Sequence, residues 1–266
     1  MYKYLHNESG NVITALLPAI YFTYQLACGL FNFGENHQRL QTWQSNIFMF
    51  LTGYSCSFDM WTSFIYHLYS PMGKHKCEKL LALDMAGICA VILSNFIVIA
   101  FYLFADWSQE RLIIMSVFTP LILSNFLVIF HPACVKESMF CCKVMVIFTT
   151  LFSLLVLVII GRLFLSTDFH VEVIYPRLFT AFAALMLGFT FFVSAFPERA
   201  TNNRYVELLF NSHVFWHILV FVCEYNLYWT CYDLNVQHEE QLLVQTGSWM
   251  NFDSDYIYAN FLFSFG

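Results

Sequence analysis

One stretch of the sequence decides the fold class: KLLALDMAGICAVILSNFIVIAFYLF, Lys79–Phe104. Within it only Lys79 and Asp84 carry a charge. A helix needs about 20 mostly apolar residues to cross the hydrocarbon core of a bilayer. This stretch is long enough to do so, and we therefore predict that it forms a transmembrane helix.

Six further stretches have a similar length and composition. We therefore predict an all-α membrane protein, a bundle of seven transmembrane helices over residues 11–229. A short segment, 1–10, precedes the bundle and an acidic tail, 230–266, follows it. The predicted spans are Asn11–Phe31, Asn46–Tyr69, Lys79–Phe104, Leu112–Phe130, Cys142–Leu165, Ile174–Phe196 and Glu207–Trp229.

Composition supports this class and excludes others. Hydrophobic residues make up 59% of the 266 residues and charged residues 11%, against roughly 45–50% and 25% in soluble domains. The net charge of −6 leaves no basic patch for a nucleic acid. Cys28, Cys56, Cys89 and Cys223 lie inside apolar runs and are interpreted as small core residues.

The distribution of Lys and Arg predicts the orientation. With the N-terminus in the cytosol, eight basic residues lie on the cytosolic side and four on the other side, and the tail has none. Because cytosolic loops are enriched in Lys and Arg, the N-terminus is predicted to be cytosolic and the C-terminus extracellular or lumenal. Asn7, in the sequon Asn7-Glu8-Ser9, should then be unglycosylated.

Ionisable side chains within spans are costly and often functional. His213 and His217 are four residues apart, so they share a helix face, as do Ser63 and His67. Counted along their helices, the three histidines and Asp84 fall in the cytosolic half of the bundle. Because catalytic zinc commonly has three protein ligands, these residues predict a zinc site; the alternative is histidines that only pack.

Five motifs together resemble the progestin and adipoQ receptor (PAQR) family. HNESGN (His6–Asn11) is similar to that family's HNExxN, SFIYH (Ser63–His67) to its SxxxH, and LALDMAGI (Leu81–Ile88) to its LDxxGI. FPER (Phe196–Arg199) and NSHVFWHIL (Asn211–Leu219) are similar to its ER and SHxxxH motifs. The stretches YLHNESGN and KLLALDMAGIC look closest to those of the short members of the family.

The resemblance implies a zinc ion near the inner leaflet, held by His67, His213 and His217. It implies that Asp84 orients a water molecule and that Ser63 lies beside the site. Members of the family are described as hormone receptors and as ceramidases, so we predict a zinc-dependent hydrolase of ceramide-like lipid amides. The expected location is the plasma membrane or an ER or Golgi membrane.

Two other functions remain open: a receptor for an extracellular ligand with a structural zinc, and a non-catalytic scaffold. An open coordination position beside three histidines favours the enzyme.

Several further residues have two interpretations each. Glu8 is either a gate, or a contact to the seventh span outside the metal ligands, or a helix N-terminal charge that the helix dipole favours. Asp59 and Glu224 either line a polar cavity or are neutral, hydrogen-bonded carboxyls of the core. Four cysteines at predicted cytosolic ends of spans are either palmitoylated or free thiols: Cys77, Cys134, Cys141 and Cys142.

Overall fold

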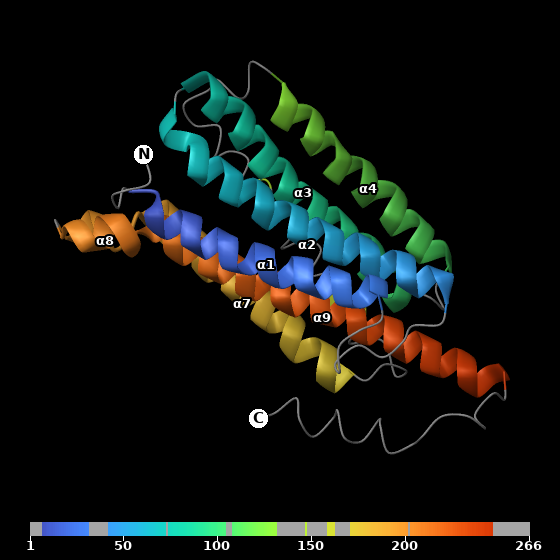
Figure 1. Ribbon diagram of the computed structural model, residues 1–266. Coiled ribbons are helices and arrows are strands. Elements are labelled where there is room, and N and C mark those ends of the chain that lie inside the picture. The colour runs from blue at the N-terminus through green and yellow to red at the C-terminus, as the bar shows by residue number, and fades with distance from the viewer. Residues whose placement is uncertain are drawn as a thin grey trace.

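The computed structural model describes residues 7–31, 42–72, 74–104, 108–131, 147, 159–162, 171–201 and 203–246. This part of the chain is helical and contains no strand (Figure 1). Its helices are α1 (Ser9–Phe31), α2 (Trp43–Tyr69), α3 (Lys74–Leu103), α4 (Ser108–Phe130), α7 (Val171–Ser194), α8 (Arg204–Leu209) and α9 (Ser212–Thr246). The 3-10 helices η1 (Ser70–Met72) and η2 (Glu198–Ala200) follow α2 and α7.

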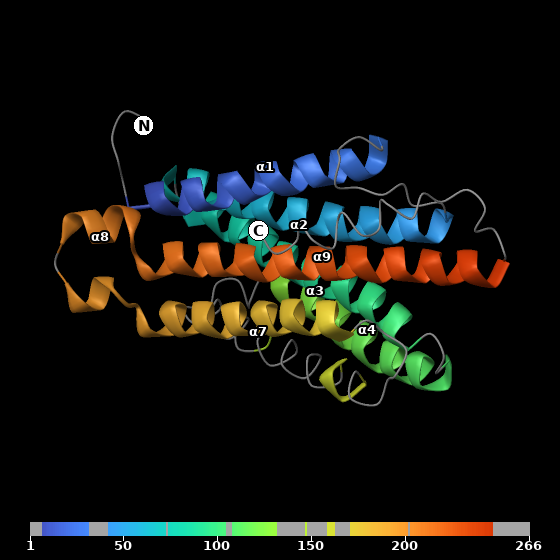
Figure 2. The same ribbon diagram turned by 90° about the horizontal axis from the view of Figure 1, so that it is seen from below.

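Helix α9 is the element around which the bundle is arranged. It packs most extensively against α7 and also contacts α1, α2 and α3, while α2 lies between α1 and α3 (Figures 1 and 2). One apolar core joins α3, α4, α7 and α9, and a smaller one joins α1, α2 and α9. The starts of α1 and α9 and the end of α2 lie together at one end, which we call the histidine end.

Within the part of the chain that the structure describes, five helices are long and apolar enough to cross a membrane. They correspond to the first, third, fourth, sixth and seventh predicted spans. The second span does form a helix, α2, but it is not among the five because the side of it that faces the bundle is polar: Thr52, Ser55, Asp59 and Ser63 are all buried. The fifth predicted span, Cys142–Leu165, lies almost entirely outside the described residues.

The seventh predicted span, Glu207–Trp229, lies within a candidate membrane span, Arg204–Leu242, but the helices there have other bounds than predicted at both ends. Arg204–Leu209 forms the separate short helix α8, and α9 starts only at Ser212. A new start is favoured there because the Asn211 side chain accepts a hydrogen bond from the backbone N–H of Val214 at 3.0 Å, as an N-cap does.

At its other end α9 continues to Thr246, so residues 230–246, which the sequence assigned to the tail, are helical. Their polar side chains mark this stretch as a tail in the sequence, but neighbouring helices bind them. Asp233 forms an ion pair with Arg177 of α7 at 3.3 Å, and Asn235 accepts a hydrogen bond from the Tyr102 hydroxyl at 2.6 Å. Packing against other helices therefore extends α9 beyond its apolar part.

The cysteines that the structure describes are all free thiols. Cys28, Cys56, Cys89 and Cys223 are buried, which confirms the prediction that they are small core residues. Cys77 lies near the start of α3 and is half-buried. The other palmitoylation candidates, Cys134, Cys141 and Cys142, lie outside the described residues.

Candidate metal centre

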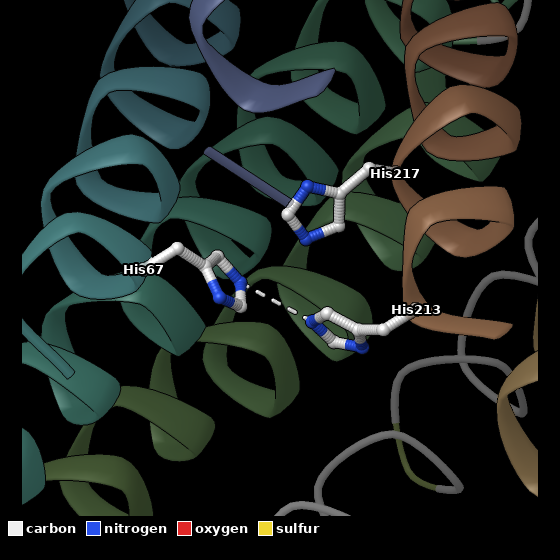
Figure 3. A group of neighbouring side chains, drawn as sticks. All are labelled: His67, His213 and His217. Carbon is white, nitrogen blue, oxygen red and sulfur yellow. Dashed lines mark hydrogen bonds between the residues drawn. The ribbon is translucent and has the colours of Figure 1, made fainter. Parts of the chain in front are cut away.

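Three imidazoles meet at the histidine end of the bundle. His67 comes from the last turn of α2, and His213 and His217 come from the first two turns of α9. Figure 3 shows the three rings turned toward one another, and their nearest ligand atoms all lie within 4.8 Å. The Nε2 atoms of His67 and His213 are 3.2 Å apart. Two helices that are antiparallel therefore supply one ligand cluster.

The start of α9 is fixed by a carboxylate from the preceding turn. Glu198 accepts hydrogen bonds from both the backbone N–H of Ser212, at 2.6 Å, and the Ser212 hydroxyl. A carboxylate at this position satisfies a free N–H and suits the positive end of the helix dipole. His213 is the next residue, so these bonds fix the helix turn that carries it.

A close approach of α1 to α9 completes the site. A Cβ atom on Gly10 would lie 2.6 Å from Val214 Cγ2 and 3.1 Å from the Leu209 carbonyl oxygen, which is too close. Glycine at this position lets α1 lie against the start of α9. Glu8 and Thr14, on either side of Gly10, then reach two of the three histidines.

Glu8 sets which ring nitrogen of His67 carries a proton. Its Oε2 lies 2.8 Å from His67 Nδ1 and accepts a hydrogen bond from the Asn11 side chain, also at 2.8 Å. Burial raises the pKa of Glu8, but the hydrogen bonds from His67 and Asn11 outweigh it and lower the pKa to about 2. Because Glu8 is therefore ionised, His67 donates through Nδ1 and leaves the Nε2 lone pair facing the other imidazoles.

Thr14 plays the corresponding part for His217. Its Oγ1 lies 3.4 Å from His217 Nδ1 and donates its own proton to the Gly10 carbonyl at 2.9 Å. With the hydroxyl proton used, the oxygen can only accept, so His217 donates through Nδ1 and its Nε2 carries a lone pair.

These donors fit a metal ion. Nitrogens bound tetrahedrally at about 2.0–2.1 Å from zinc lie roughly 3.3 Å apart, close to the 3.2 Å between the Nε2 atoms of His67 and His213. Imidazole also suits copper, iron and nickel. The triad can thus hold a metal ion, with the Nδ1 atoms of His67 and His217 directed outward to Glu8 and Thr14.

A cavity of about 470 Å³ adjoins the triad. The six residues that the sequence analysis assigned to the site line it: Glu8, Ser63, His67, Asp84, His213 and His217. Asp84 and Ser63 are buried, and the Ser63 hydroxyl contacts the Asp84 carboxyl. The structure therefore brings a carboxyl group into the same cavity as the imidazoles, from a third helix, α3.

Sequence reasoning missed the residues that support the site. The contacts of Thr14 with His217 and of Glu198 with Ser212 span 203 and 14 residues, and spacing within one helix does not reveal them. Asp59 lines the cavity, as one of the two interpretations of Asp59 and Glu224 predicted. Its carboxyl group also contacts that of Glu224, as the other interpretation, hydrogen-bonded core carboxyls, predicted.

The fold and this site define a class of membrane protein, and comparison with known proteins identifies it. The family model described as "Haemolysin-III related" matches residues 3–228, so the chain belongs to this family. Progestin and adipoQ receptor family member 3 of Mus musculus is 25% identical over 248 residues, and that of Homo sapiens is 26% identical. Each alignment covers 89% of this chain and 76% of the relative. Membership of the PAQR family, predicted from the motifs, is confirmed.

Proposed function

We propose that this chain is a zinc-dependent hydrolase of lipid amides of the ceramide type. The observation that carries the proposal is the joint placement of three imidazoles and the Asp84 carboxyl around one cavity. Structural zinc sites are normally closed by four protein ligands, whereas catalytic sites use three and keep one position open. Among the described residues, the only group of this kind has three members, His67, His213 and His217.

The residues of the chain have distinct parts in the proposed reaction. Zinc, when bound by the triad, would polarise the amide carbonyl and make water nucleophilic near neutral pH. Asp84 takes a proton as water oxygen bonds to the carbonyl carbon, and it returns this proton to the nitrogen as the carbon–nitrogen bond breaks. Ser63, in contact with Asp84, orients that carboxylate. The products are a fatty acid and a sphingoid amine.

The walls of the cavity support a lipid substrate. Besides the polar residues, apolar side chains from α2, α3, α7 and α9 face it: Met60, Leu81, Met85, Ile88, Phe192, Trp216 and Val220. A long acyl chain could bury its methylene groups against this wall, at about 0.8 kcal/mol for each group buried.

Fatty-acid release from ceramide by the purified full chain in detergent, with metal content measured on the same sample, tests the proposal. We expect stoichiometric zinc and release that stops on chelation and returns when zinc is added. A metal-loaded chain that releases no fatty acid would exclude the hydrolase.

The second candidate is a receptor with a structural metal, which the relatives favour because their names describe them as members of a receptor family. The same experiment separates the two, since a receptor retains zinc without turnover.

We further propose that the histidine end faces the cytosol, as the distribution of Lys and Arg predicts. Glycosylation tests this orientation. Asn7 should stay unmodified, whereas a sequon made at Asn251 by Asp253→Thr, beyond α9, should be glycosylated, so that endoglycosidase treatment removes the glycan and increases the electrophoretic mobility of the chain. The reverse pattern would place the histidine end in the lumen.

A further inference from the structure

Two carboxyl groups lie in the middle of the bundle, away from the imidazoles. Asp59 of α2 and Glu224 of α9 are each 3% exposed, and their side chains are in hydrogen-bonding contact. Asp59 is two helical turns from His67, and Glu224 is two turns from His217. The proposed hydrolase does not use either residue.

No cation balances this pair within the described part of the chain. The ion pairs found there are those of His67 with Glu8 and of Arg177 with Asp233, both elsewhere. The titratable groups that face the pair are acids as well: Asp84 and Cys89 from α3, Cys56 from α2 and Cys223 from α9. Two touching, buried carboxylates with no counter-charge cannot both stay ionised.

A bound metal ion is a poor explanation for this arrangement. Within the described residues, only the histidine triad places three metal-ligating groups close enough to share an ion. Ions that prefer oxygen ligands take six or more of them and complete the set with water, whereas both members of this pair are only 3% exposed. A proton needs only two oxygens, one on each side of it.

The carboxyl pair also has oxygens that are free to bind a proton, and one of its members is in contact with the cavity. In the described structure, Asp59 Oδ1 and Glu224 Oε2 are buried without a hydrogen-bond partner. Asp59 lines the cavity of the metal centre, whereas Glu224 does not. Asp59, Ser63 and His67 follow one another at four-residue intervals along one face of α2. Asp59 is therefore the member of the pair that can exchange with the cavity.

We propose that Asp59 and Glu224 form a proton-binding site that holds one shared proton and exchanges it with the cavity. The step is a transfer between oxygens. A proton leaves Asp59 for a water molecule in the cavity, which becomes hydronium, while the pair is left with two negative charges. The return of a proton from that hydronium to Asp59 restores the shared proton. The site thus stores a proton beside Asp84, and this property does not depend on whether the chain hydrolyses lipid amides.

Infrared spectroscopy of the full chain in detergent tests the site, because a protonated carboxyl absorbs separately from a carboxylate. We expect the Asp59→Asn/Glu224→Gln double variant to lose the absorption of one protonated carboxyl per chain. Asp233→Asn is the matched control, since Asp233 is a carboxylate of α9 paired with Arg177. Its replacement should leave the band unchanged, and an Asp84→Asn spectrum identifies any contribution from Asp84.

If the double variant lost no protonated-carboxyl absorption, or lost the absorption of two such groups, the proposal of one shared proton would be wrong. The first result would mean that both groups are ionised, as around a metal cation. Exchange with the cavity predicts that the band of the parent chain shifts on transfer to D₂O, and a band that keeps its position in D₂O would contradict it. If the double variant does not fold, isotope labelling of the side-chain carboxyl carbons of aspartate or of glutamate assigns the band in the parent chain.

Discussion

The two ends of the α2–α9 interface bury polar groups in different ways. At the far end from the histidines, the backbone N–H and the hydroxyl of Thr42 both donate to Glu239 Oε1 at 2.9 Å. The Tyr102 hydroxyl there donates to Asn235, whose amide donates in turn to the Cys231 carbonyl at 2.6 Å. We call this far end the closed end, because these donors and acceptors meet within the protein, although the buried Gln44 Nε2 and His238 Nδ1 have no hydrogen-bond partner among the described residues there.

At the histidine end, two imidazole nitrogens that point away from the cluster have hydrogen-bond partners. The nitrogens that point into the cluster cannot all be satisfied by the protein groups that the structure describes. Nδ1 of His67 and of His217 have partners in Glu8 and Thr14, while the Nε2 lone pairs of these rings face the third imidazole. One proton between His213 and His67 could satisfy at most one such contact. The difference teaches that buried polarity stabilises the helices at one end and forms a binding site at the other.

The largest expected effect is the loss of the metal. Replacing His213 or His217 by Ala removes one of three ligands, and two imidazoles hold zinc weakly, so zinc per chain should fall from stoichiometric to near zero. His238→Ala, on the same helix at the closed end, is the control and should keep its zinc. Elemental analysis of the purified variants is the measurement. Stoichiometric zinc in the His213→Ala/His217→Ala double variant would remove the distinction between the two ends.

Asp84→Asn should separate binding from chemistry. The amide has the size of the carboxyl but cannot accept the proton, so zinc should remain and fatty-acid release should fall about 100- to 10,000-fold. Asp233→Asn changes a carboxylate at the closed end in the same way and should retain turnover. Turnover of Asp84→Asn equal to that of the parent would take Asp84 out of the mechanism and favour the receptor.

Glu8→Gln should weaken the metal site without destroying it. The change removes the charge that accepts the His67 Nδ1 proton, and losing such a partner typically lowers metal affinity about 10- to 100-fold. Glu207→Gln is a matched control because Glu207 lines the same cavity and loses the same charge. Competition with a zinc chelator measures both. Equal losses in the two variants would indicate a general effect of negative charge and not the bond to His67.

The contrast between the two ends also shows what the sequence can predict. Apolar runs predicted most of the helices, since crossing a bilayer requires them. The intervals between Ser63 and His67 and between His213 and His217 predicted the shared helix faces, because four residues make about one turn. Depth along the predicted spans placed Asp84 in the same layer as the histidines, and the resemblance to a known family implied its part beside a bound water molecule.

Apolar runs and intervals within one helix do not predict the contacts between helices. The closed end was assigned to a tail because Asp233, Asn235 and Glu239 look like surface residues until Arg177, Tyr102 and Thr42 are placed beside them. The bond of Thr14 to His217 was missed for the same reason. Glu8 was predicted as a contact to the seventh span, and its bond to His67 on α2 was not foreseen. Periodicity reports which side of a helix is apolar, but it does not report which polar partner lies on the neighbouring helix.

The smallest expected effect tests the closed end. Tyr102 is 2% exposed and its hydroxyl donates to Asn235 Oδ1 at 2.6 Å, so Tyr102→Phe leaves a buried acceptor without this donor. The cost should be about 1 kcal/mol, since hydrogen bonds between membrane helices average about 0.6 kcal/mol and an unsatisfied buried group adds to the loss. Unfolding in mixed micelles measures this loss of stability, with Tyr54→Phe as the control because Tyr54 is 51% exposed on α2.

Zinc content and turnover of Tyr102→Phe should match those of the parent, because the bond serves only stability. If Tyr102→Phe instead lowered zinc affinity while leaving stability unchanged, the closed end would be part of the metal site, and the division of the interface into two ends would be wrong.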